Sequence, residues 1–512
     1  MLVKTFGYAV QGISATKVTV EVNVDVGLNF YMVGLPDNAV KESQQRIQTA
    51  LKQYGYKIPG KRITINMAPA DIKKEGSAYD LTIAIGILAA SEQIRFETIS
   101  NYAIMGELAL DGGLRAIKGV LPIALKAKED GFTGMILPEI NAREAAVVEG
   151  LDVFYADNII QVIDFFNGKG ELAKAKINLK EAFQNSAPSP EFDFADVKGQ
   201  ETIKRALEIA AAGGHNAILI GPPGAGKTML SKRLPGILPP LTLDEALETT
   251  KIHSVAGRTG KASGLVTQRP FRSPHHTISD VALVGGGKNP QPGEISLAHN
   301  GVLFLDELPE FKRTVLEVMR QPMEDRVVTI SRAKSSVEYP SSFMLVASMN
   351  PCPCGYYNHP EKECVCAPGI VQKYLNKVSG PLLDRIDLHI EVTPVPFQEL
   401  NRQQNSETST QIRERVIRAR LIQGKRYQQN KTIYCNAQMQ TRDLKDHCRL
   451  TEAGTALLKN AMEKLGLSAR AYDRILKVAR TIADLDSTPD IETHHVAEAI
   501  QYRSLDREGW AG

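Results

Sequence analysis

A run of glycines that ends in lysine and threonine lies near the middle of the chain and has the composition of a phosphate-binding loop. It fits the pattern G-x-x-x-x-G-K-[ST], follows the apolar residues 216–220 and precedes residues that can begin a helix. Glycines let backbone N–H groups point at phosphate oxygens, while the lysine contacts the β- and γ-phosphates and the threonine hydroxyl holds Mg²⁺. We therefore predict a nucleotide site formed by Gly221, Pro222, Pro223, Gly224, Ala225, Gly226, Lys227 and Thr228.

Two carboxylates follow a second apolar run, at residues 302–305. Four apolar residues followed by two acids are typical of a buried strand that ends in a metal and water site. Asp306 would hold Mg²⁺ through water, and Glu307 would polarise the attacking water. An acidic turn at the end of a strand is the alternative. Together with the phosphate loop, this motif predicts ATP hydrolysis with Mg²⁺.

The composition limits the classes of protein to which the chain can belong. Its 512 residues are 43% hydrophobic, so about two to four domains can each bury a core. The net charge of +3 does not by itself indicate nucleic acid, so DNA-contacting residues would have to be clustered. No apolar run reaches the roughly 18 residues of a membrane span, and residues 1–10 lack the apolar centre of a signal peptide. We expect a soluble cytoplasmic protein without membrane contact.

Alternating apolar patterns predict an α/β fold with a helical C-terminal part. Residues 1–175 form one α/β domain, with expected strands at 17–26, 62–67, 103–110 and, last, 134–138, and expected helices at 38–54, 79–90 and 120–130. Residues 176–192 are expected to be a linker, because their Ser and Pro residues cannot continue a helix. The ATPase core is expected at 193–394 and a helical lid at 395–512.

One segment of the first domain resembles the Lon protease domain. Residues 74–78 followed by an apolar helix are similar to the nucleophile region of that family, which implies a Lon-like, or S5-like, fold. The serine of the family aligns with Ala78 and its lysine falls near Val120, so the favoured interpretation is a non-catalytic domain. A shifted pair of Ser77 and Lys118 is the alternative, since a Ser–Lys pair needs only hydrogen-bond reach.

Basic residues between and after the two ATPase motifs are candidates for DNA contacts. Within the Gly- and Pro-rich residues 257–293, Arg269 and Arg272 could contact phosphates and Phe271 could stack on a base. A solvated loop is the alternative there, and metal binding by two adjacent histidines is a weaker one.

A second basic segment is predicted to form a hairpin. The expected strands 326–330 and 336–339 flank a turn that holds Arg332 and Lys334. The position of this hairpin, just before the next core strand, resembles the pre-sensor-1 hairpin of the clade that contains magnesium chelatase and the MCM helicases. Its two basic side chains could follow a DNA backbone. An exposed, solvated hairpin end is the alternative.

Three further residues resemble conserved parts of AAA+ ATPases. Asn350, after an apolar strand, resembles sensor 1, which senses the γ-phosphate. Arg385, in the run Leu-Leu-Asp-Arg, resembles the arginine finger, which reaches the γ-phosphate of a neighbouring subunit and so implies a ring. A structural arginine paired with Asp384 or Asp387 is the alternative. Arg470, in Ser-Ala-Arg, resembles sensor 2.

Four of the six cysteines fall within fifteen residues, in the pattern C-x-C-x₉-C-x-C. In a cytosolic chain such a cluster favours a metal over disulfides, and four thiolates can form a closed tetrahedral Zn²⁺ site. Free thiols are the alternative, because C-x-C pairs are less typical of such sites than C-x-x-C pairs, and His359 could replace one ligand. The candidate ligands are Cys352, Cys354, Cys364 and Cys366.

Taken in order, these motifs resemble the magnesium-chelatase-like ComM/YifB family of bacterial AAA+ proteins over nearly the whole chain. The resemblance implies a hexameric ring helicase that moves branch points in DNA during homologous recombination and natural transformation. Its implied partners are branched or single-stranded DNA and further copies of the chain. Two alternatives remain: a motor of the magnesium chelatase type, which lacks a fused Lon-like domain, and a Lon-like protein remodeller.

Overall fold

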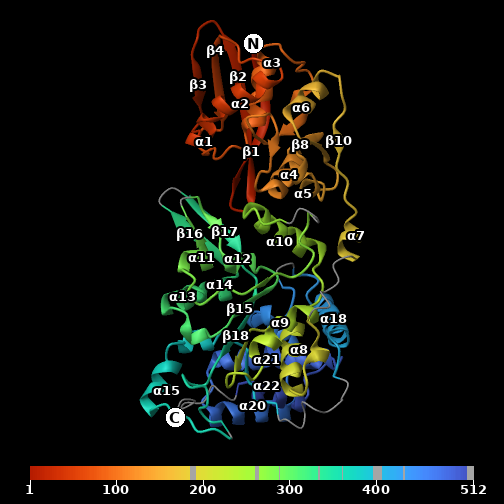
Figure 1. Ribbon diagram of the computed structural model, residues 1–512. Helices are drawn as coiled ribbons and strands as arrows, with labels where there is room; N and C mark the ends of the chain where they lie inside the picture. Colours follow the sequence, from red (N-terminus) through yellow and green to blue (C-terminus); the bar gives the residue numbers. More distant parts are fainter. Residues whose placement is uncertain are drawn as a thin grey trace.

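The chain folds into an N-terminal α/β domain that stands on a larger α/β domain with helices at its far end (Figure 1). No helix among the described residues has both the length and the apolar composition needed to cross a membrane. The computed structural model describes residues 1–184, 192–259, 264–287, 289–332, 335–359, 361–395, 406–430 and 433–503.

The N-terminal domain is built on an eight-stranded mixed sheet with the strand order β10-β9-β8-β5-β1-β2-β4-β3. Its helix α3 is buried along its whole length, because the sequence there is apolar on every side. The strands are β1 (Leu2–Gln11), β2 (Ser14–Asp25), β3 (Phe30–Val33), β4 (Arg62–Ala68), β5 (Tyr102–Ile104), β8 (Gly134–Pro138), β9 (Asp152–Ala156) and β10 (Ala173–Lys174). The helices are α1 (Asn38–Lys41), α2 (Ser43–Gln53), α3 (Asp80–Ala90), α4 (Val120–Glu129), α5 (Glu139–Ala145) and α6 (Ile159–Phe166).

Two expectations for this domain were wrong. Residues 103–110 are not one strand: β5 ends at Ile104, and β6 (Glu107–Leu108) pairs with β7 (Leu114–Arg115) in a separate ribbon. The break arises because the Gly106 carbonyl accepts a hydrogen bond from Leu81 and its N–H donates to Ala78, which turns the chain towards the start of α3. Residues 134–138 are not the last strand, since β9 and β10 extend the sheet.

The second domain has a five-stranded parallel sheet in the order β12-β15-β18-β11-β19. Every residue of the three central strands is buried, as is typical of a parallel sheet covered on both faces. The strands are β11 (Ala217–Ile220), β12 (Phe271–Arg272), β15 (Val302–Leu305), β18 (Met344–Met349) and β19 (Leu388–Glu391). The helices are α8 (Glu201–Gly213), α9 (Lys227–Ile237), α10 (Leu243–Val255), α11 (Asp280–Val284), α12 (Glu294–Leu297), α13 (Arg313–Val318), α14 (Arg320–Asp325), α15 (Pro368–Leu375) and α16 (Gly380–Leu383).

The basic hairpin forms as an antiparallel pair, β16 (Val327–Arg332) and β17 (Ser335–Pro340). By contrast, the centre of the Gly- and Pro-rich insert is not a free loop. Phe271 lies on β12 at the edge of the core sheet and stacks on Phe304 with ring centroids 5.9 Å apart. This packing leaves its ring partly buried against Phe304, and base stacking by Phe271, which was expected of a free loop, stays a prediction.

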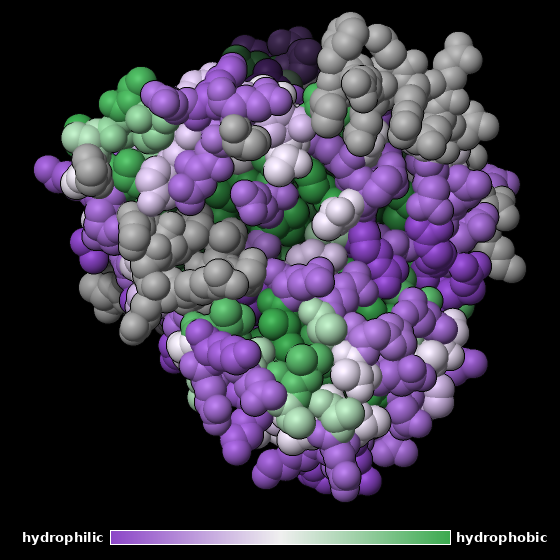
Figure 2. Space-filling model, turned by 90° about the horizontal axis from the view of Figure 1, so that it is seen from below, coloured by the Kyte–Doolittle hydropathy of each residue, from purple (hydrophilic) through white to green (hydrophobic). Residues whose placement is uncertain are grey.

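The C-terminal part is helical, and a buried ion pair joins it to the core sheet. Arg474 of α21 pairs with Asp387, which is fully buried just before β19. Burial would raise the pKa of Asp387, but Arg474 and His215 lower it below its usual range, so the carboxylate stays charged. The helices are α18 (Ser409–Arg426), α19 (Thr441–His447), α20 (Glu452–Leu465), α21 (Ala469–Leu485) and α22 (Thr493–Gln501). The end of the molecule remote from the N-terminal domain is mostly hydrophilic (Figure 2).

The two domains share a packed interface. Leu241, just before α10, and Ala246, within its first turn or so, belong to the hydrophobic core of the N-terminal domain. The Thr259 hydroxyl donates a hydrogen bond of 2.8 Å to Glu144, and Gly12 in the β1–β2 turn lies against Val337 of β17. The N-terminal domain therefore contacts both α10 and the hairpin. Between the domains, the expected linker 176–192 contains α7 (Leu179–Gln184), and its residues 185–191 lie outside the described residues.

Candidate nucleotide-binding site

Three neighbouring strands bring the predicted ATPase motifs together. The phosphate loop follows β11, Asn350 follows β18, and the two acidic residues follow β15. Strand β18 lies between the other two and is parallel to both. Because the carboxyl ends of parallel strands meet at one edge of the sheet, motifs far apart in the sequence converge there.

Lys227 is held at the centre of this edge. Its ammonium group donates hydrogen bonds to the carbonyl oxygens of Gly221 (2.7 Å) and Pro222 (2.8 Å) and to Oδ1 of Asn350 (3.0 Å). Burial lowers the pKa of Lys227, and the nearby carboxylates of Asp306 and Glu307 oppose this effect. The structure therefore joins the loop lysine directly to the predicted sensor residue.

The backbone of the loop has the conformation that phosphate binding requires. Gly224 and Gly226 adopt positive φ angles of 79° and 87°, which favour glycine. Among the described residues, no acceptor is bonded to the backbone N–H groups of Gly224, Gly226 and Lys227. Helix α9 begins at Lys227, so the positive end of its dipole points at the same place. These free donors fit the phosphates of a nucleotide.

The two acidic residues have different surroundings. Asp306 accepts a hydrogen bond from the Thr228 hydroxyl (2.8 Å) and another from the Ser348 hydroxyl. It is therefore fixed beside the threonine predicted to hold Mg²⁺. Glu307, in contrast, has a side chain that is 61% exposed, and its carboxylate lies 3.8 Å from Nδ1 of His276. A carboxylate that is held in place, such as Asp306, suits the binding of a metal. An accessible carboxylate, such as Glu307, suits the orientation of a water molecule.

Ser348 is a site residue that sequence analysis missed. It is the fifth residue of β18, and Ala347 before it pairs with Leu305 across the sheet. Ser348 is therefore level with Asp306 and can donate to it. A hydroxyl near the end of an otherwise apolar strand is the only sign of this role in the sequence.

The predicted arginine finger and sensor 2 do not contact the phosphate loop in the single chain. Arg385 is buried, with 5% of its surface exposed, and pairs with Glu324 at 2.5 Å instead of Asp384 or Asp387. Arg470 is exposed in the first turn of α21. Contact of these two arginines with nucleotide therefore stays a prediction. For Arg385, the predicted contact is with the nucleotide bound by a neighbouring subunit.

The four clustered cysteines are brought together. Their sulfur atoms all lie within 4.8 Å of one another. His359 does not belong to this group, and its Nδ1 accepts hydrogen bonds from the backbone N–H groups of Glu361 and Lys362.

Arg269 and Arg272, predicted to bind DNA, bind carboxylates of the same chain. Arg269 pairs with Glu245 at 3.0 Å and also donates to the carbonyl oxygens of Pro239, Pro240 and Asn300. Arg272 makes two hydrogen bonds to Glu294, of 2.6 and 2.8 Å. In the single chain, these contacts engage both guanidinium groups with carboxylate and carbonyl groups of the same domain. On the hairpin, the Arg332 side chain and all of Lys334 lie outside the described residues.

We expect the change Arg269→Ala to lower stability and to leave the DNA affinity of the folded protein unchanged. The change leaves the carboxylate of Glu245, which is 6% exposed, without its cationic partner. Breaking such a buried pair typically lowers the free energy of unfolding by about 3 kcal/mol. Urea unfolding measures this loss. The control Arg258→Ala removes a 49% exposed arginine and should cost under about 1 kcal/mol. Unchanged stability combined with weaker DNA binding would contradict the structural role.

The N-terminal domain does not form the alternative Ser–Lys pair. The Ser77 hydroxyl donates to Glu107, whereas the Lys118 side chain lies against Gly257 in the second domain. Ala78 and Val120, at the positions of the Lon nucleophile and lysine, pack with the apolar core. This placement fits a non-catalytic domain.

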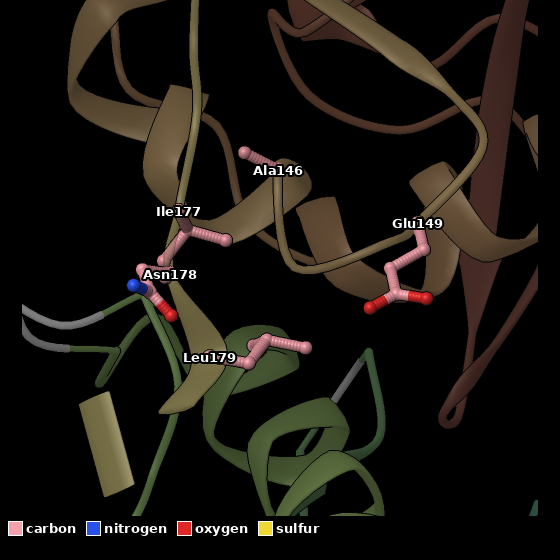
Figure 3. A pocket seen from close by; sticks show the side chains of 5 residues that line it. All are labelled: Ala146, Glu149, Ile177, Asn178 and Leu179. Atoms are coloured by element: carbon pink, nitrogen blue, oxygen red, sulfur yellow. The ribbon is translucent and has the colours of Figure 1, made fainter. Parts of the chain in front are cut away.

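A small hollow lies where the chain leaves the N-terminal domain (Figure 3). Among the described residues that line it, Glu149 and Asn178 carry the polar side chains, and neither is a cation that would bind a phosphate. It is lined by Ala146, Glu149, Ile177, Asn178 and Leu179.

The chain matches known families along most of its length. Residues 193–400 match the family described as magnesium chelatase, subunit ChlI, residues 20–141 match subunit ChlI of Mg-chelatase, and residues 406–503 match the ChlI C-terminal family. The chain is 45% identical to competence protein ComM of Haemophilus influenzae over 504 residues, which cover 98% of this chain and 97% of that protein. It is 45% identical to YifB of Escherichia coli (strain K12) over 503 residues, or 98% and 96% of the two chains.

A shorter similarity connects the chain to proteases. Lon protease 2 of Bacillus subtilis is 31% identical over 159 residues, which are 28% of this chain and 27% of that protein. The chain therefore belongs to the magnesium-chelatase-like ComM/YifB family of AAA+ ATPases, with a Lon-like N-terminal domain.

Proposed function

We propose that this protein is an ATP-driven ring motor on DNA, a helicase that promotes branch migration in homologous recombination and natural transformation. In this proposal it acts in the cytoplasm as a homo-oligomeric ring, a hexamer, on branched or single-stranded DNA. It uses ATP and Mg²⁺, and it holds Zn²⁺ in its cysteine cluster. The relative from Haemophilus influenzae supports a role in DNA uptake, because it is named a competence protein.

The observation that carries the ATPase part is the convergence of three motifs at one sheet edge. In this proposal Lys227 exchanges its carbonyl partners for phosphate oxygens, and Thr228 and Asp306, which are hydrogen-bonded to each other, hold Mg²⁺. The accessible Glu307 carboxylate orients a water in this proposal, and Asn350, which is bonded to Lys227, senses the γ-phosphate. This arrangement supports hydrolysis without a covalent intermediate.

The connection between this edge and the hairpin supports the motor part. Strand β17 ends at Pro340, and β18 begins at Met344 and leads directly to Asn350. Three residues and one six-residue strand thus separate the hairpin from the residue proposed to sense nucleotide. A basic hairpin attached in this way can grip a regular phosphate backbone without reading bases.

A magnesium chelatase motor is the second candidate, because all three matching family models are described by the ChlI subunit. A protein remodeller, suggested by the Lon-like domain, is the third. ATP turnover of the purified protein should be measured alone, with branched DNA, with a porphyrin-binding chelatase subunit, and with an unfolded protein. We expect stimulation by DNA only. Stimulation by either of the other partners without a response to DNA would contradict the motor proposal.

We expect the double change Arg332→Ala, Lys334→Ala to abolish DNA stimulation and branch movement while DNA-free turnover stays nearly intact. The loss should be similar for every DNA sequence, and the salt dependence of binding should fall by about one unit of slope per lost phosphate contact. Titrations of DNA at several salt concentrations measure this slope.

A matched control is the double change Arg418→Ala, Lys425→Ala. It removes the same charge from exposed positions on α18, far from the hairpin in the sequence. DNA stimulation should survive in this variant. If the hairpin variant still moved branched DNA at the parental rate, the hairpin would have no part in gripping DNA.

A further inference from the structure

The cysteine cluster has the geometry of a single metal site. The Cys352 sulfur lies 3.3 Å from that of Cys354 and 3.6 Å from that of Cys364, and the latter two are 3.5 Å apart. The Cys366 sulfur completes the group. Zinc–sulfur bonds of about 2.3 Å in a tetrahedron place sulfurs about 3.8 Å apart. The observed spacing is close to that value, and all four cysteines are free thiols.

The backbone around the cluster is arranged as it is around a bound thiolate. The Cys352 sulfur accepts hydrogen bonds from the N–H groups of Gly355 (3.2 Å) and Tyr357 (3.3 Å). These donors stabilise negative charge on a sulfur that is completely buried. Four soft ligands without an open position suit a structural Zn²⁺ rather than Mg²⁺ or Ca²⁺.

The other cluster of potential ligands in the described residues does not fit a metal. It consists of Asp486, His494 and His495. Nδ1 of His495 accepts a hydrogen bond from the Glu492 N–H at 2.9 Å. Its Nε2 must therefore carry the proton that faces Asp486 at 3.2 Å, and a protonated nitrogen cannot bind a metal.

The cysteine loop also touches the phosphate loop. Gly355 lies so close to Pro223 that a Cβ atom built on it would be 2.4 Å from the proline Cδ, and its φ angle is +86°. On the other side, Cys352 follows Asn350 by two residues, and Asn350 is bonded to Lys227. The loop is therefore attached to the nucleotide site at two points, through Asn350 and through Pro223.

We propose that Cys352, Cys354, Cys364 and Cys366 bind one Zn²⁺, and that the metal-bound loop forms a wall of the nucleotide site. Zinc occupancy then controls nucleotide affinity, because an unfolded loop cannot hold Pro223 and Asn350 in place. This inference rests on the nucleotide site proposed above and assigns a control to it.

The first test measures the metal. Elemental analysis of protein purified without chelators should find about one zinc per chain. The variant Cys364→Ser should lose zinc, whereas Cys435→Ala, which changes a buried cysteine outside the cluster, should keep it. Full zinc content in Cys364→Ser, or metal-free parental protein with intact nucleotide affinity, would overturn the proposal.

The second test measures the coupling, with a fluorescent ATP analogue as the probe. Zinc is released from the parental protein with a mercurial thiol reagent and followed with a colorimetric chelator, while circular dichroism monitors the rest of the fold. Nucleotide affinity should fall by about tenfold or more and recover when thiol and zinc are returned. Unchanged affinity after complete zinc release would overturn the coupling.

A variant that keeps the metal separates the two parts. Gly355→Ala leaves all four cysteines in place but puts a methyl group against Pro223 at a positive φ angle. It should retain zinc and lose nucleotide affinity. Retention of both would overturn the contact, whereas a parental protein that contains zinc but binds no nucleotide would instead refute the nucleotide site itself.

Discussion

The variant Glu307→Gln should bind ATP with the same affinity as the parent. Its rate of hydrolysis should be lower than that of the parent by a factor of about 100 or more. Lys227, Thr228 and Asp306 remain to bind the nucleotide and Mg²⁺, but the amide cannot accept a proton from the attacking water. The exposed position of the carboxylate makes this effect specific, because its replacement disturbs no packed contact. Single-turnover hydrolysis and equilibrium binding of ATP measure the two quantities separately.

The matched control for this prediction is Glu310→Gln. It makes the same chemical change three residues later in the same loop, on an exposed side chain that pairs only with Lys377 among the described residues. Its turnover should equal that of the parent. Turnover of Glu307→Gln within a few-fold of the parent would remove Glu307 from the mechanism.

The variant Arg385→Ala should lose about 1,000-fold in turnover while it retains nucleotide affinity. An arginine that acts on a neighbouring subunit stabilises the charge of the transition state and contributes little to ground-state binding. In mixtures with Lys227→Ala subunits, some interfaces combine an intact finger with an intact phosphate loop. Turnover of the mixture should therefore exceed that of either variant alone.

The pair with Glu324 provides a control for a purely structural role. Glu324→Gln breaks the same ion pair but leaves the arginine in place. If Arg385 acts as a finger, Glu324→Gln keeps most of the turnover and the two variants differ widely. Equal losses in both variants, with equal changes in thermal stability, would mean that Arg385 only holds the fold together.

The arrangement of the candidate ATP site could be predicted from sequence because each motif includes the strand that positions it. The phosphate loop, Asp306 and Asn350 each follow an apolar run, and parallel strands bring the ends of such runs to one edge. Sequence spacing could also group the four cysteines, because they lie within one short loop. In these cases the information is local, so the prediction does not depend on the overall fold.

Contacts between distant segments could not be predicted in this way. The partners of Arg269 and Arg272 are Glu245 and Glu294, which lie 24 and 22 residues away. The sequence alone does not distinguish arginines that face solvent from arginines that pair with carboxylates of distant segments. The contact of Gly355 with Pro223 could not be predicted either, because the two residues are far apart in the sequence.

Strand β18 limits how the hairpin can move. It is hydrogen-bonded on both sides, to β11 and to β15, so it cannot slide along its own axis without breaking two ladders at once. The hairpin is closed at its base by a hydrogen bond from the Ser341 N–H to the Arg326 carbonyl. If the protein is the proposed motor, movement of the hairpin would have to come from a hinge at that base or from rotation of whole subunits. The core sheet therefore provides a rigid support on which the hairpin is mounted, and sliding of its strands does not move the hairpin.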